Sequence, residues 1–79
     1  MFHSVLSMPR PIQLKLVIKV LHAKGFIFIS QAGSHAKFRK TGNPTLTVII
    51  KMGKKEIPYG TFRSILLLSG LTENDFRKK

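Results

Sequence analysis

The chain has 79 residues, enough for one domain whose apolar core lies near the lower limit of what folds unaided. It has no cysteine, which excludes disulfides and thiolate metal sites as reinforcement of that core. Its 14 lysines and arginines stand against 3 acidic residues, giving a formal net charge of +11. Such a domain repels itself when compact, so we expect a polyanionic or acidic partner, with nucleic acid as the first candidate.

The first residues carry little pattern. Residues 1–7 lack the basic start and the small-residue cleavage site of a signal peptide, and Met8 offers a second start. We therefore expect residues 1–7 to be a flexible extension and residues 8–79 to be the domain. No apolar run approaches the ~18 residues that span a bilayer, so we predict a cytoplasmic protein outside the membrane.

Residues 12–24 fit two patterns. One is the helical spacing of Leu14, Val17, Ile18 and Leu21, and the other is an alternation of apolar residues typical of a strand. The segment is longer than a usual strand of ~4 to 8 residues, and it closes with basic residues before Gly25, which suits a left-handed cap. These features favour a helix, with Pro11 in its first turn.

Three strands are predicted next. Residues 26–30 are aromatic and β-branched, which indicates a strand that is apolar on both faces and therefore central or well covered. After a turn at residues 32–34, the second strand covers residues 35–40. A loop rich in turn formers, residues 41–44, leads to the third strand at residues 45–51. The short loops predict an antiparallel meander.

The second strand carries the candidate site. Side chains alternate along a strand, so His35, Lys37 and Arg39 share one face while Ala36 and Phe38 point into the core. Histidine exchanges protons near neutral pH, and neighbouring cations attract a phosphodiester. The pattern therefore predicts that this face processes or binds nucleic acid.

A second helix follows the basic connection that Pro58 ends. Thr61 is the expected cap, and Gly70 is the expected stop. The buried stripe of this helix is predicted at Phe62, Ile65, Leu66 and Ser69. A short terminal turn follows, which Thr72 can cap. The order helix, three strands, helix predicts an α+β fold with a three-stranded antiparallel sheet and both helices on one face.

Several short motifs, taken together, resemble one known family. They are Gly25-Phe26, Gly33-Ser34-His35 followed by Phe38, the run Ile-Pro-Tyr-Gly-Thr-Phe-Arg-Ser-Ile-Leu at residues 57–66, and Gly70-Leu71. Over about residues 8–76 the chain resembles the HicA toxin family, also called YcfA-like. The resemblance implies a double-stranded-RNA-binding-like fold, α-β-β-β-α. It also implies a small mRNA interferase, the toxin of a type II toxin–antitoxin system.

The resemblance implies the catalytic role as well. In that family the histidine of the Gly-Ser-His turn is catalytic, which corresponds to His35, and Gly33 and Ser34 would support it. We expect His35 to act as general base on a ribose 2′-hydroxyl, leaving a 2′,3′-cyclic phosphate. Family members often carry a second histidine directly afterwards, where this chain has Ala36. The general acid is not identified by the sequence.

Basic side chains near His35 are the expected RNA-binding residues: Lys37, Arg39, Lys40, Lys54, Lys55 and Arg63. A solvated surface charge is the alternative for each of them. His3 and His22 are assigned to no site, and the scattered histidines and acids give poor spacing for a metal. We expect neither a metal nor another cofactor.

The resemblance also implies a HicB-type antitoxin that binds and silences the toxin. We expect a monomer when free and a hetero-oligomer with the antitoxin. The alternative is a non-catalytic RNA-binding module, or an inactive toxin relative with the same fold. An active toxin and either of these alternatives would bind RNA in a salt-sensitive way, so only turnover of RNA distinguishes the enzyme from them.

Overall fold

The computed structural model describes residues 10–77, so the predicted extension and His3 lie outside the described residues. Along the chain the elements are β1 (Ile12–Gln13), α1 (Leu14–Ala23), β2 (Ile27–Ala32), β3 (His35–Lys40), β4 (Leu46–Lys51), β5 (Glu56–Ile57), α2 (Tyr59–Ser69) and α3 (Glu73–Arg77).

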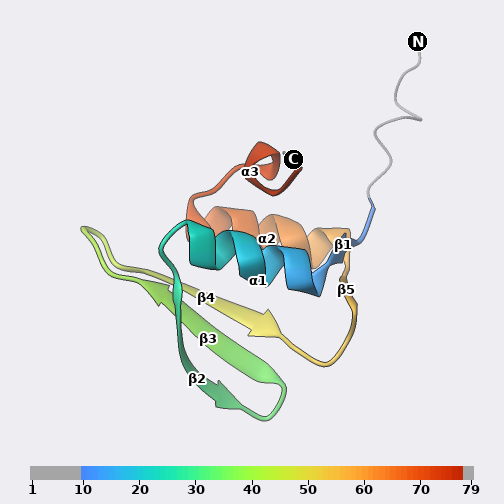
Figure 1. Cartoon of the computed structure of the whole chain (residues 1–79), viewed down its shortest axis with the longest axis horizontal. Helices are drawn as coiled ribbons and strands as arrows, with labels where there is room; N and C mark the ends of the chain where they lie inside the picture. The colour runs from blue at the N-terminus through green and yellow to red at the C-terminus, as the bar shows by residue number, and fades with distance from the viewer. Residues whose placement is uncertain (1–9, 78–79) are drawn as a thin grey trace.

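The centre of the fold is a three-stranded antiparallel sheet in the order β2-β3-β4. α1 and α2 lie side by side over one face of this sheet, and the other face is uncovered (Figure 1). Four side chains of β3 and β4 are buried between sheet and helices: Ala36, Phe38, Val48 and Ile50. The predicted α+β fold, with both helices on one face, is confirmed.

α1 begins later than predicted, and Pro11 is not in its first turn. Ile12 pairs with Ile57 in a small second sheet of β1 and β5, and the Leu14 N–H donates to the Lys55 carbonyl at 2.8 Å. These contacts hold Ile12–Gln13 extended, although the local pattern favours a helix from residue 12. Pairing with a segment distant in sequence overrides local propensity here.

The predicted glycine cap of α1 is confirmed. Gly25 has a φ of 99°, which a side chain would strain. The Phe26 N–H donates to the Leu21 carbonyl at 2.9 Å, and the Gly25 N–H donates to the His22 carbonyl at 3.1 Å. Phe26 and Leu21 are both buried. These two bonds and the apolar contact form a Schellman motif, which turns the chain from α1 into β2.

β2 is an edge strand, so the prediction of a central or well-covered strand is wrong. All six of its residues are exposed, and among residues 10–77 it pairs only with β3. Ile27, Phe28 and Ile29 retain 59%, 51% and 39% of their exposure. The composition of a strand does not by itself determine its position in a sheet, because that position depends on which other strands pair with it.

The second helix begins at Tyr59 with Pro58 as its N-cap residue, so Thr61 lies inside α2 and the prediction that it caps the helix is wrong. Gly70, with a φ of 74°, ends α2 as predicted. Phe62 and Ile65 are buried on the predicted stripe, as is Ser69. The buried Ser69 hydroxyl donates to the Leu66 carbonyl and accepts the Leu71 N–H, so it has partners for both functions.

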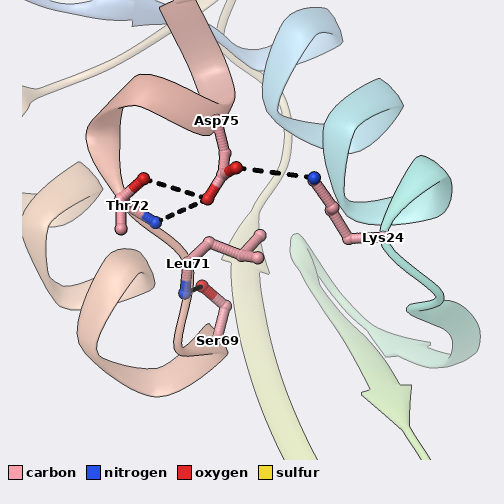
Figure 2. Close-up of polar contacts among 5 residues, drawn as sticks. All are labelled: Lys24, Ser69, Leu71, Thr72 and Asp75. Carbon is pink, nitrogen blue, oxygen red and sulfur yellow. Dashed lines mark hydrogen bonds and ion pairs between the residues drawn. The ribbon is translucent and has the colours of Figure 1, made fainter.

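The terminal turn forms a short helix, α3. The Thr72 side chain was predicted to cap this helix as an acceptor, and the structure shows the reverse direction. The Asp75 carboxylate accepts hydrogen bonds from the Thr72 N–H at 2.8 Å and from the Thr72 hydroxyl at 3.1 Å (Figure 2). Thr72 is thus the donor. Lys24 Nζ lies 3.4 Å from Asp75 Oδ1, which ties α3 to the end of α1.

Candidate active site and nucleic-acid interface

A tight turn presents His35. Gly33 and Ser34 join β2 to β3, and Ala32 pairs with His35 across the turn. Gly33 has a φ of 60°, and no non-glycine residue described has a positive φ, so the pattern matches a type II′ hairpin turn. The Gln31 side-chain amide donates to the Gly33 carbonyl at 3.0 Å, which braces the turn. His35 is therefore the first residue of β3, and it is exposed.

The strand register determines which side chains share the uncovered face, which we call the open face. Reading across β2, β3 and β4, three rows lie on it: Ala32–His35–Lys51, Ser30–Lys37–Ile49 and Ile27–Arg39–Thr47. His35, Lys37 and Arg39 thus lie together, opposite the buried Ala36 and Phe38. Arg39 Nε lies 3.5 Å from the hydroxyl of Thr47, its cross-strand neighbour on this face.

Lys51 is the cation paired with His35, and the sequence interpretation did not include it in the site. The Met52 N–H donates to the Ser34 carbonyl at 2.6 Å, so Ser34 and Met52 are a hydrogen-bonded pair. The next pair, His35 and Lys51, is consequently of the non-hydrogen-bonded kind, with Cα atoms about 4.5 Å apart and closely spaced side chains. The sequence could have indicated Lys51, because this residue follows Ile49 by two positions and therefore lies on the same face of the third strand.

The other predicted RNA-binding residues lie elsewhere. Lys40 is on the helix side of the sheet, where its side chain runs past Gly25, so that a Cβ there would lie 3.3 Å from Lys40 Cε. Arg63 is exposed on α2, in the helix layer. Lys54 and Lys55 are exposed in the connection between β4 and β5. The structure therefore does not bring Lys40 or Arg63 onto the open face.

In the described part of the chain, the cations of the open face have no carboxylate partner. Within residues 10–77, the ion pairs are Lys24 with Asp75 and Arg77 with Glu73, and both involve α3. The same described segment contains no group of three metal-ligating side chains. The charge of the open face is consequently available to an external anion.

Position 36 belongs to the core. Ala36 is fully buried in β3, on the face of the sheet opposite to its neighbours His35 and Lys37. A side chain at this position points toward the helices, so it cannot join His35 on the open face.

Fold and site together define a small, strongly cationic α+β domain that exposes one histidine among basic side chains on an uncovered sheet. The family model described as HicA toxin of bacterial toxin-antitoxin matches residues 15–71. The chain belongs to the HicA toxin family, as the sequence motifs predict. It is a toxin of a toxin–antitoxin pair, in a family whose members are generally ribonucleases.

Comparison with curated proteins gave no significant match. In the described part of the chain, no helix has both the length and the apolar character needed to cross a membrane.

Proposed function

We propose that this protein is a metal-independent mRNA endonuclease, the toxin of a type II system, and that His35 is its catalytic residue. The observation that supports this function is the pairing of the exposed His35 with Lys51 on the open face. Lys37 and Arg39 continue the same cationic surface along β3. A base and several cations on one accessible face suit a reaction that builds negative charge at phosphorus.

The reaction uses the neighbouring hydroxyl of the substrate itself. The neutral imidazole of His35 accepts the proton of a ribose 2′-hydroxyl, and the resulting 2′-oxygen attacks the adjacent phosphorus. The bond from phosphorus to the 5′-oxygen breaks, and that oxygen takes up a proton from the solvent. The products are a 2′,3′-cyclic phosphate and a 5′-hydroxyl. DNA lacks the attacking group, so the chemistry is restricted to RNA.

The cations stabilise the transition state and hold the strand. Lys51 lies beside His35, where the non-bridging phosphate oxygens gain charge, and Lys37 occupies the next row. Positioned charges of this kind act most strongly on the transition state, because the charge that they stabilise develops there. Arg39 lies further along the face and would bind a neighbouring phosphate.

The same face suits the inhibitor. We propose a HicB-type antitoxin whose acidic surface covers the open face and competes with RNA. The support is the net charge of +11 and the absence of carboxylate partners for the cations of this face in residues 10–77. Inhibition by occlusion requires no conformational change in the toxin.

The test compares native protein, His35→Ala and His22→Ala on a long single-stranded RNA in excess chelator. His22 is the matched control, an exposed histidine of α1 whose ring makes an edge contact with Phe38 in the helix layer. We expect cleavage by the native protein and by His22→Ala, and none by a folded His35→Ala. Intact RNA in all lanes, with equal gel shifts, would contradict a nuclease and indicate a binding module.

A further inference from the structure

A hollow of about 1000 Å³ lies where α1 begins, between the first turn of that helix and the connection from β4 to β5. Its walls are held together by backbone contacts. Gln13 pairs with Glu56, and the Leu14 N–H donates to the Lys55 carbonyl at 2.8 Å. The backbones of the two segments therefore keep a fixed relation to each other.

Three lysines line this hollow, and one carboxylate accompanies them. Lys15 comes from α1, and Lys54 and Lys55 come from the connection, together with Glu56. Within residues 10–77 none of the four takes part in an ion pair, and the first turn of α1 has no acidic residue. Three unneutralised cations repel one another, and a bound anion would relieve that repulsion.

The connection that lines the hollow begins directly after the open-face residue Lys51. β4 ends at Lys51, opposite His35, and Lys54 follows three residues later. The hydrogen bond from the Met52 N–H to the Ser34 carbonyl, 2.6 Å long, joins this connection to the turn that presents His35. Figure 1 shows the start of β3, the end of β4 and the pair β1–β5 at the same end of the molecule.

We infer that the hollow is a phosphate-binding subsite for the part of the RNA that flanks the cleaved bond. This inference rests on the proposed function. The strand leaves the open face at Lys51, passes the end of β4 and places a backbone phosphate among Lys15, Lys54 and Lys55. Lys15, which sequence patterns placed only on a helix, thereby becomes an RNA-binding residue, and Glu56 weakens the same contact.

The test measures equilibrium binding of a single-stranded RNA with 2′-methoxy groups, which offers no hydroxyl for cleavage. Lys15→Gln is compared with Lys19→Gln, which removes an exposed lysine from the same helix, one turn away and outside the hollow. Loss of one phosphate contact lowers the slope of log affinity against log salt by about 0.7, or affinity about fivefold at 0.1 M salt. We expect this loss for Lys15→Gln, a clearly smaller one for Lys19→Gln, and tighter binding for Glu56→Gln.

Equal losses in the two lysine variants would overturn the subsite. So would a Lys15→Gln variant that binds RNA normally and binds the antitoxin poorly, because the hollow would then serve the protein partner. The phosphate subsite and the nuclease activity can be refuted independently of each other. Cleavage that depends on His35, with equal losses in both lysine variants, refutes only the subsite. A lysine difference without cleavage by the native protein refutes only the nuclease.

Discussion

His35 and Lys51 face each other across β3 and β4 as a single cross-strand pair on the open face. The hydrogen bond from the Met52 N–H to the Ser34 carbonyl makes this pair one of the closely spaced kind. The two residues that carry the imidazole and the ammonium group are thus positioned by backbone pairing rather than by a flexible loop. That arrangement would preorganise the charge around a phosphate before the reaction begins.

Lys51→Gln is expected to lower kcat for RNA cleavage about 10²-fold with little change in KM, because the ammonium group acts mainly on charge that develops in the transition state. Single-turnover and steady-state cleavage rates would measure this. Lys19→Gln removes the same charge from α1, away from the open face, and serves as the control. An unchanged kcat in Lys51→Gln would remove Lys51 from the catalytic account.

The turn before His35 requires glycine for its backbone conformation. Gly33→Ala is expected to destabilise the fold by about 1–3 kcal/mol, because φ at Gly33 is 60° although the space around it is empty. Gly60→Ala adds the same methyl group in equally open space inside α2, without a positive φ, and should be neutral or stabilising by up to about 1 kcal/mol. Urea unfolding compares the two, and equal effects would contradict the assigned turn.

Two adjacent isoleucines of β4 lie on opposite faces of the sheet. Ile50 is fully buried, whereas Ile49 keeps 43% of its exposure on the open face. Ile50→Ala should lower the free energy of unfolding by about 2–5 kcal/mol, as buried isoleucines do. Ile49→Ala should change it by less than about 1 kcal/mol, because much of this side chain stays in water. Similar losses for both would show that the assigned strand faces are wrong.

The Asp75 carboxyl makes the free energy of unfolding depend on pH. Hydrogen bonds from the Thr72 N–H and hydroxyl, and then the charge of Lys24, lower the pKa of Asp75 from its ordinary value of 3.8. A carboxyl whose pKa is lower in the folded state stabilises the fold above its unfolded pKa. This contribution is lost as the pH falls through the folded pKa.

Asp75→Asn should therefore be less stable than the native protein near neutral pH, and the difference should shrink in acid. Thermal unfolding at a series of pH values would measure it. Glu56→Gln also removes one carboxylate, which forms no ion pair among the described residues, and is the control for the loss of one negative charge. A constant difference between the native protein and Asp75→Asn at every pH would contradict the assigned contacts.

Local signals predicted much of this fold. The glycines at positions 25 and 70 identified the ends of two helices, because each helix ends in a left-handed residue there. Residues 35–40 form the predicted strand, and alternation along it correctly separated His35, Lys37 and Arg39 from the core. These features depend only on neighbours in the sequence.

The structural features that the sequence did not predict depend on pairing between segments that are distant along the chain. β1 and β5 are two residues each, too short for a periodic signal, and they exist because Ile12 meets Ile57. The edge position of β2 follows from the sheet order. The pairing of His35 with Lys51, and the position of Lys15 and Lys54 around one hollow, likewise depend on segments that lie far apart in the sequence.

The central claim is that His35 activates a ribose 2′-hydroxyl, and blocking that hydroxyl tests it most directly. A cut site is first mapped on a natural RNA, and the same RNA is then made with one 2′-methoxy group at the nucleotide before the cut. We predict that cleavage at that position disappears, that binding is unchanged, and that the unmodified RNA yields 2′,3′-cyclic phosphate ends. Continued cleavage at the blocked nucleotide, or products with 3′-hydroxyl ends, would contradict the mechanism.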